Sequence, residues 1–194
     1  MLEPILPFRE PVVIEPSVLR MVCERACHGY EARHKRESFG FVFGTLARTG
    51  RLLVRRAVPY RGGTRTRTGV SFDNWDSVLR VLRRREQLAR ELGMRFLGGF
   101  HSHVEIAGKV FHGFSASDRR SLRRDPHAAL EVVTSVWAGG KLPARASDRA
   151  VSLFQEETGY SYRVRVYAKR RPGIRQVKVR VKDRPSLLIL GPAC

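Results

Sequence analysis

The sequence predicts an α/β fold in which helices sandwich a mixed β-sheet. Segments rich in β-branched and aromatic residues alternate with segments whose apolar residues recur at helical spacing, which indicates strands and helices in turn. The 194 residues and the 42% apolar fraction suit one globular domain with its own core, expected to span residues 1–194. The expected elements are a strand at 11–16, a helix at 18–34, strands at 37–46 and 51–59, a helix at 72–92, a strand at 94–103, a short helix from 115 that ends before Pro126, and strands at 129–140, 160–170 and 175–181.

The first half of the chain is expected to hold a strand, a helix and a hairpin. Ser17 is placed to cap the helix that follows the first strand. The strand at 37–46 is rich in phenylalanine, and Gly40 and Gly44 within it indicate close approach of neighbouring backbone. A short Arg-Thr-Gly turn then leads into the strand at 51–59, which is predicted to be its hairpin partner.

The second half continues this alternation. The segment 60–71 has the composition of a loop. In 72–92 the apolar residues share one helical face with arginines opposite, and Gly93 is a stop signal. The last two strands, 160–170 and 175–181, alternate polar and apolar residues, and they are expected to form an outlying, basic C-terminal β-hairpin.

The chain is strongly basic, with 37 Lys and Arg against 18 Asp and Glu and a formal charge of +19. Ten basic residues and one acid follow Tyr160. Such a balance favours acidic partners, which include nucleic acid, an acidic protein or anionic lipid. In some organisms most proteins are rich in basic residues, and the charge then says little about function. The sequence has no apolar run long enough for a membrane span and no signal-peptide pattern at its start, so a cytoplasmic protein without a membrane partner is expected.

Two histidines separated by one residue end the strand at 94–103. Because alternate residues of a strand project to the same face, His101 and His103 can reach one ion. Asp118, in the first turn of the next helix, could be a third ligand. Two histidines and one carboxylate with an open fourth position are typical of a catalytic zinc site, where zinc lowers the pKa of water toward neutrality.

Two further residues could complete a hydrolytic site. Glu37 could shuttle a proton from water to a leaving amine, and Ser115 could stabilise a developing oxyanion. Each also has a simpler interpretation: Glu37 as a solvated acid, and Ser115 as the N-cap of the short helix with Asp118 in its first turn. A histidine pair in a strand is weak evidence for a metal by itself, so the prediction depends on all these elements occurring together.

Their order resembles a known family. Glu37-Ser-Phe-Gly-Phe-Val-Phe-Gly, then Gly-Gly-Phe-His-Ser-His, then Ser-Ala-Ser-Asp is similar to the pattern of the JAMM (MPN+) zinc metalloproteases, which is an upstream Glu, His-Ser/Thr-His and Ser-x-x-Asp. The resemblance covers roughly 10–140 and leaves 141–194 as a divergent basic extension. It implies a JAMM/cytidine-deaminase-like fold and one Zn²⁺ per chain. The residues carried over are His101, His103 and Asp118 on zinc, Glu37 as acid/base and Ser115 at the oxyanion.

The chain departs from the family pattern after the second histidine. Val104 replaces the usual proline, and eleven residues separate His103 from Ser115 where the family usually has seven. The longer segment leaves the ligand chemistry intact but makes substrate specificity uncertain.

Four residues of this longer segment are candidates for a role. Glu105 and His112 are expected to be exposed loop residues rather than rival ligands or substrate contacts. Phe111 and Phe114 are predicted either to cover a bound substrate tail or to pack in the core.

The resemblance also implies a substrate class. Family members hydrolyse isopeptide or peptide bonds after the C-terminal Gly-Gly of ubiquitin or a ubiquitin-like protein. Prokaryotic relatives process ubiquitin-like or sulfur-carrier proteins, sometimes beside E1- and E2-like enzymes. An extended Gly-Gly tail could add to a sheet edge beside the strand at 98–103. The expected function is therefore a deubiquitinase-like isopeptidase or a processing peptidase.

Two alternative functions would involve the same region of the chain. A zinc nucleobase deaminase would share the His-x-Glu of His103 and Glu105, but it needs a later Pro-Cys-x-x-Cys, and no cysteine lies between Cys27 and Cys194. A non-catalytic scaffold of the JAMM fold is the other, although inactive relatives usually lose ligands and here all are present.

A third alternative is a nucleic-acid-binding module. Its binding surface would be the basic strands at 161–184, with Tyr160, Tyr162 and Tyr167 as stacking rings on an electrostatic platform. This function does not exclude an enzyme.

Overall fold

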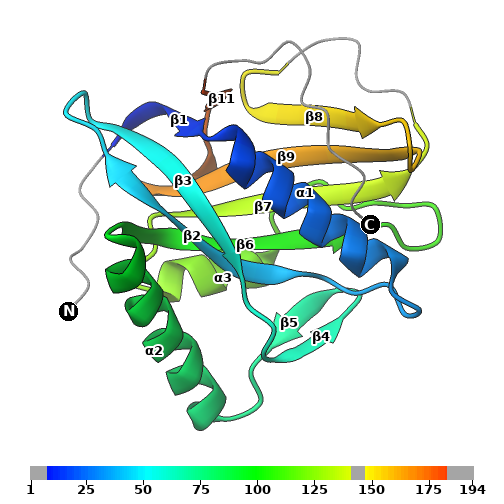
Figure 1. Ribbon diagram of the computed structural model, residues 1–194, viewed down its shortest axis with the longest axis horizontal. Helices are drawn as coiled ribbons and strands as arrows, with labels where there is room; N and C mark the ends of the chain where they lie inside the picture. The colour runs from blue at the N-terminus through cyan, green and yellow to red at the C-terminus, as the bar shows by residue number, and fades with distance from the viewer. Residues whose placement is uncertain (1–7, 141–146, 183–194) are drawn as a thin grey trace.

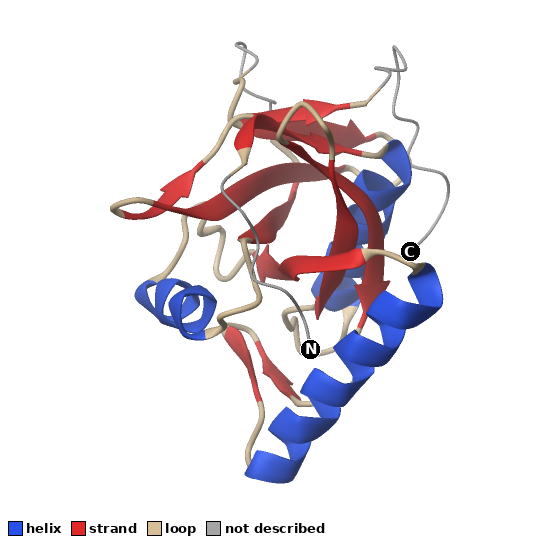
Figure 2. Ribbon diagram, turned by 90° about the vertical axis from the view of Figure 1, so that its left-hand side faces the viewer, coloured by secondary structure: helices blue, strands red, loops and turns tan. Residues whose placement is uncertain are grey.

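The computed structural model describes residues 8–140 and 147–182. Within these residues the main feature is a nine-stranded mixed β-sheet. Helix α1 (Pro16–Glu31) crosses the front of the sheet in Figure 1, and Figure 2 shows the sheet lying between α1 and the short helix α3 (Ala116–Arg124). The predicted class, a mixed sheet with helices on both faces, is confirmed.

The strand order shows which strands are central. The sheet runs β10 (Gly173–Gln176), β9 (Tyr160–Arg170), β7 (Leu130–Ala138), β6 (Arg95–Val104), β2 (Phe39–Leu46), β3 (Arg51–Pro59), β1 (Arg9–Ile14) and β11 (Val179–Val181), with β8 (Ala150–Gln155) paired to β9. β2 and β3 form the expected hairpin. β6 is paired on both sides, antiparallel to β2 and parallel to β7. The expected free edge beside residues 98–103 is therefore wrong.

The C-terminal strands are part of the sheet and not an outlying hairpin. β10 folds back antiparallel on β9, but β9 also pairs with β7 and β8. Val164, Val166 and Ala168 of β9 are fully buried. The alternation of the sequence reflects one apolar face in the core, and this burial holds β9 in the sheet despite its arginines. β8 was not expected, and β11 leaves β10 to pair in parallel with β1.

Helix α1 begins two residues earlier than predicted, at Pro16 instead of Val18. Pro16 occupies its first turn, where the missing N–H costs nothing. Glu15 is the N-cap residue without a side-chain capping bond, so the prediction that Ser17 caps this helix is wrong. One face of α1 is buried against the sheet.

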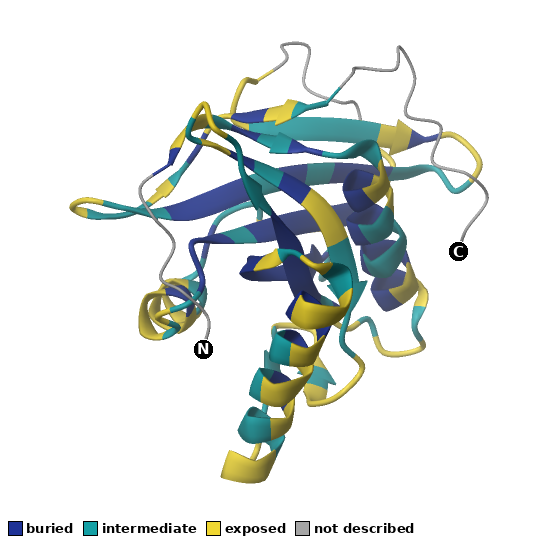
Figure 3. Cartoon of the chain, turned by 60° about the vertical axis from the view of Figure 1, so that its left-hand side comes forward, coloured by how far each residue is buried: buried dark blue, intermediate teal, exposed yellow. Residues whose placement is uncertain are grey.

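Helix α2 (Trp75–Leu92) has well-defined ends. The Asn74 side chain accepts a hydrogen bond from the third helical N–H, and Gly93 ends the helix in the left-handed conformation with φ 60°, as predicted. Figure 3 shows that the end of α2 that begins at Trp75 is largely exposed, whereas the central strands are buried. Among the described helices, none is long and apolar enough to cross a membrane.

The expected loop at 60–71 contains a small second sheet. Strands β4 (Thr64–Thr66) and β5 (Gly69–Ser71) pair antiparallel beside the start of α2. In the described part of the chain each pairs as a strand only with the other, and the main-chain oxygen of Thr66 in β4 accepts a hydrogen bond from the Glu37 N–H at 2.8 Å.

Two hydrophobic clusters lie on opposite faces of the main sheet. The larger lies under α1, and the smaller lies under α2 and α3. Phe100 of β6 belongs to the larger cluster, and it explains the glycine at position 40: a Cβ atom on Gly40 would lie 2.4 Å from the Phe100 ring. The prediction that Gly40 marks a close approach is confirmed.

Candidate metal centre

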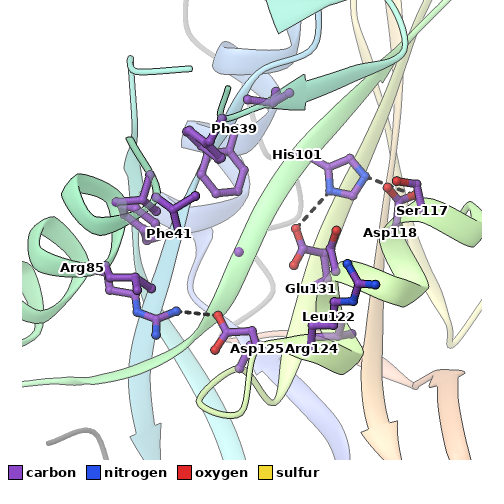
Figure 4. Close-up of a pocket in the computed structure, with 18 of the residues that line it drawn as sticks. Phe39, Phe41, Arg85, His101, Ser117, Asp118, Leu122, Arg124, Asp125 and Glu131 are labelled. Carbon is purple, nitrogen blue, oxygen red and sulfur yellow. Dashed lines mark hydrogen bonds and ion pairs between the residues drawn. The ribbon is translucent and has the colours of Figure 1, made fainter. Parts of the chain in front are cut away.

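The side chains of His101, His103 and Asp118 converge on one point. His101 Nε2 lies 3.1 Å from His103 Nε2, and the two nitrogens lie 3.6 and 3.7 Å from Asp118 Oδ2. The ligands of a tetrahedral ion with bonds of about 2.0–2.2 Å lie roughly 3.3–3.6 Å apart. The three atoms therefore have nearly the separations of ligands on one small cation, and Figure 4 shows His101 and Asp118 facing each other.

Each imidazole ring contacts an oxygen atom through its other nitrogen, Nδ1. His101 Nδ1 is 3.0 Å from a carboxylate oxygen of Glu131, and His103 Nδ1 is 2.9 Å from the main-chain oxygen of Phe111. In each neutral ring the Nδ1–H donates to that oxygen, which leaves the Nε2 lone pair directed at the shared point. This is the tautomer that a metal ligand requires.

The electrostatics of the cluster favour a cation. Burial lowers the pKa of His101, but hydrogen bonds and charge from Asp118 and Glu131 outweigh it and raise that pKa to about 10. Burial raises the pKa of Asp118, but hydrogen bonds from the two histidines hold it well below its usual range. The carboxylates of Asp118 and Glu131 thus stabilise a positive charge on His101. They would stabilise a divalent cation at the same point for the same reason.

Asp118 is positioned by the start of α3. Its Oδ2 accepts a hydrogen bond from the Ser115 N–H at 2.8 Å, and Ser115 Oγ accepts one from the Asp118 N–H at 3.1 Å. This capping box shows that the N-cap interpretation of Ser115 is correct. Accepting this bond leaves the hydroxyl proton of Ser115 available to donate.

Glu37 is not a solvated acid. Its side chain is 7% exposed, and it lines the same cavity as His101 and Asp118. Burial raises the pKa of Glu37 to about 7, with the His101 charge opposing this rise and the Asp118 charge adding to it. An acid with this pKa can both accept and release a proton near neutral pH.

Ser102, between the two histidines, holds the segment that carries Glu37. The Ser38 N–H donates to Ser102 Oγ at 2.8 Å, and the Ser102 N–H donates to the Ser38 main-chain oxygen at 3.1 Å. Ser102 is fully buried. The central residue of His-Ser-His therefore joins the strand of the histidines to the residue that follows Glu37.

A cavity of about 800 Å³ opens from the cluster between α2, α3 and the β4–β5 hairpin. Its wall is mostly apolar and aromatic, with a charged far end where Arg85 pairs with Asp125. Phe39, Phe41, Phe72, Trp75, Val78 and Leu82 contribute the apolar wall.

Glu105 and His112 lie apart from the metal cluster. Glu105 accepts a hydrogen bond from the Tyr30 hydroxyl at 2.6 Å, which lowers its pKa. His112 packs edge-on against Trp137, and burial lowers its pKa to about 4. Both residues are half-buried and not exposed as expected, and their structural partners, Tyr30 and Trp137, lie outside the long segment after His103.

The two phenylalanines of that segment also lie outside the cavity lining. Phe114 is buried and stacks on Tyr167 at 4.4 Å, so it packs in the core, which was the other expectation. Phe111 is 55% exposed, and its main-chain oxygen is what contacts His103. The interpretation of Phe114 as a cover for a substrate tail is contradicted by its burial.

The predicted stacking platform of tyrosines does not form. Tyr162 and Tyr167 are 1% and 5% exposed, and Tyr160 packs edge-on against Tyr30. Their rings serve the core, so they are not free to stack on bases.

Sequence reasoning missed Glu131, Ser102 and the main-chain oxygen of Phe111. A signal for Glu131 was present, because it is the one charged residue in the apolar run at 129–138. A buried charge needs a partner, and here the partner is His101. Ser102 and the Phe111 oxygen carry no comparable signal.

No protein-family model matches this sequence, and a search of curated proteins finds no match.

Proposed function

We propose that this protein is a zinc-dependent peptidase of the JAMM (MPN+) type, cleaving after the C-terminal Gly-Gly of a ubiquitin-like or sulfur-carrier protein. The single observation that carries the proposal is the convergence of two imidazole nitrogens and one carboxylate oxygen beside a buried acid, Glu37. The order of these residues along the chain is the order of the family pattern.

The donor set supports zinc. Two neutral imidazoles and one carboxylate are ligands that zinc accepts, and three protein ligands leave a position for water or substrate. Bound there, zinc would supply a Lewis acid that activates water and polarises the scissile carbonyl. His101, His103 and Asp118 would hold it.

Glu37 is suited to move the proton. Its position on the cavity lining beside His101 and its pKa of about 7 let it take a proton from the attacking water. It would then pass that proton to the amine that leaves. A well-placed general acid–base of this kind contributes about 10²–10⁴-fold to the rate.

Ser115 is suited to the developing oxyanion. Its N-cap position fixes the hydroxyl oxygen next to Asp118, and its remaining proton can point toward the reacting carbonyl. The same residue thus supports the position of a ligand and offers a donor.

The cavity supports an extended tail as the substrate. An edge of the β4–β5 hairpin could pair with the backbone of such a tail, and its Thr68, Gly69 and Val70 line the cavity. A tail that ends in two glycines has no side chains to obstruct its approach to His101 and Glu37. The net charge of +19 favours an acidic carrier by electrostatic steering.

The proposal is tested with zinc-loaded protein and ubiquitin-like proteins fused through Gly-Gly to a reporter peptide. We expect mass analysis to place the cut after the second glycine, with one zinc per chain in the protein. The His103→Ala variant should lose both zinc and cleavage. Stable zinc binding without cleavage of any fusion would favour the non-catalytic scaffold, and a folded protein that binds no zinc would end the metallopeptidase proposal.

A further inference from the structure

We propose that Glu131 is a positioning residue that holds His101 in the orientation needed for metal binding, and that position 99 is glycine to leave room for its carboxylate. The inference rests on the proposed function, because the metal concerned is the one that the proposed hydrolysis uses. It concerns a residue that the family pattern does not contain.

The sheet brings Glu131 to His101. β6 and β7 run parallel with Gly99 opposite Glu131, so that Glu131 and His101 project to the same face. Glu131 Oε1 lies 3.0 Å from His101 Nδ1, and the Glu131 side chain is only 15% exposed. Figure 4 shows the carboxylate directed at the ring, on the side away from Asp118.

The chemistry of this contact concerns which nitrogen carries the proton. An acceptor at Nδ1 keeps the proton there and turns the Nε2 lone pair toward His103 and Asp118. A carboxylate acceptor also makes the ring a stronger base toward a metal. His103 receives the same support from a main-chain oxygen, so Glu131 is the support that a side-chain substitution can remove.

Glycine is required at positions 98 and 99 for different reasons. A Cβ atom on Gly98 would lie 1.7 Å from the main-chain oxygen of Leu130, which a packed sheet cannot move. A Cβ atom on Gly99 would instead lie 2.8 and 3.0 Å from the two carboxylate oxygens of Glu131. Because these atoms end a side chain, a methyl group at position 99 would displace the carboxylate and leave the backbone in place.

The experiment measures the zinc dissociation constant of the full chain by competition with a chromophoric chelator. Glu131→Ala should weaken zinc binding about 10–100-fold, the range found for such supporting residues. The zinc affinity of Glu131→Gln should lie between those of the unmodified chain and Glu131→Ala, because its amide oxygen can still accept the hydrogen bond. Glu156→Gln, an exposed carboxylate on the turn after β8, is the charge-matched control and should not change the constant.

Gly99→Ala sharpens the test. Alone it should weaken zinc binding about tenfold, while the metal-free protein keeps its melting temperature. Combined with Glu131→Ala it should add less than about twofold, because the group that it displaces is already gone. A full tenfold effect in the double variant would overturn the role of Gly99.

The outcomes separate this inference from the proposed function. If the unmodified chain binds no zinc, the proposed function fails first. If it binds zinc and Glu131→Ala binds equally well, with an unchanged absorption spectrum when cobalt replaces zinc, only the positioning role of Glu131 is lost. A purely structural role would lower the melting temperature of the metal-free Glu131→Ala protein and leave the cobalt spectrum as it was.

Discussion

The two faces of strands β6 and β7 differ although the same two strands build them. Toward α1 the strands present Phe100, Leu130, Val132 and Val136, all within a closed hydrophobic cluster. The hydroxyl of Ser102 is the polar group of β6 on this face, and it bonds to Ser38. This side of the sheet is a core.

The opposite face of the same two strands carries the candidate metal cluster. His101, His103 and Glu131 alternate with the core residues and project under α2 and α3. Between these two helices lies the cavity of about 800 Å³. On this side Glu131 pairs with His101, and Asp118 lies within 3.7 Å of both histidines.

This difference teaches how one strand can serve both stability and function. A period of two places each side chain on one face only, so core residues and ligands can be adjacent in sequence without sharing an environment. Phe100 and His101 are neighbours of this kind. Substitutions on one face should therefore affect stability, and substitutions on the other should affect metal binding and turnover.

The largest effect should come from the functional face. Glu37→Gln keeps the shape of the side chain but removes the proton acceptor, so cleavage should fall about 10²–10⁴-fold. The zinc content should remain one per chain, because Glu37 is not among the converging ligands. Rates on a Gly-Gly fusion, with metal analysis of the same sample, test this. Activity within tenfold of the unmodified chain would remove Glu37 from the mechanism.

The next effect should come from the core face. Phe100→Ala removes a ring that is 1% exposed, and such truncations cost about 3–5 kcal/mol. The zinc dissociation constant of the folded protein should change by less than about threefold, because the ring points away from His101. Urea unfolding of the metal-free protein and a zinc titration measure the two quantities. A tenfold loss of zinc affinity would show that the faces are coupled.

The third expected effect is a dependence of stability on pH that arises from Glu37. The pKa of Glu37 is raised from 4.5 to about 7 in the folded protein. Its protonated form is therefore favoured by folding, so its contribution to stability is present below about pH 4.5 and is lost as the pH rises toward 7. The loss is roughly 3 kcal/mol, since one pKa unit corresponds to about 1.36 kcal/mol.

Glu37→Gln removes this titration. In the metal-free protein the variant should gain stability relative to the unmodified chain between pH 4.5 and 7, as measured by urea unfolding at several pH values. Groups that titrate in both proteins, such as His101, largely cancel in the difference. Parallel stability curves would contradict the raised pKa.

The candidate metal ligands could be predicted because their spacing in the sequence is local. His101 and His103 need only the two-residue period of a strand, and Ser115 and Asp118 need only the first turn of a helix. Most of the helices and strands followed for the same reason, from runs of β-branched residues or a helical apolar stripe. The end of α2 at Gly93 is an example.

What could not be predicted depends on contacts between distant segments. The burial of β9 and the pairing of β11 with β1 follow from the strand order, which no local pattern encodes. Glu131 meets His101 only because β6 and β7 align in one register. The cap of α1 failed for a local reason: Pro16 can occupy the first turn, so the helix begins before Ser17.

The smallest effect on stability concerns the two helix caps. Asn74 caps α2 and Ser115 caps α3, and both form a capping box. Replacing either by alanine should cost about 1 kcal/mol of stability. Asn74→Ala lies away from the ligands and should leave turnover unchanged, whereas Ser115→Ala should also slow cleavage by about 10²-fold if its hydroxyl donates to the oxyanion.

Comparing the two caps therefore separates an effect on stability, expected for both, from an effect on turnover, expected for Ser115 alone. Ser115→Thr keeps both the cap and a hydroxyl, so it should restore most of the stability and part of the turnover. Urea unfolding and rates on the same Gly-Gly fusion give both quantities for each variant. If Ser115→Ala and Asn74→Ala lose equal stability and both keep full turnover, Ser115 acts only as the N-cap that holds Asp118, and the oxyanion is stabilised without it.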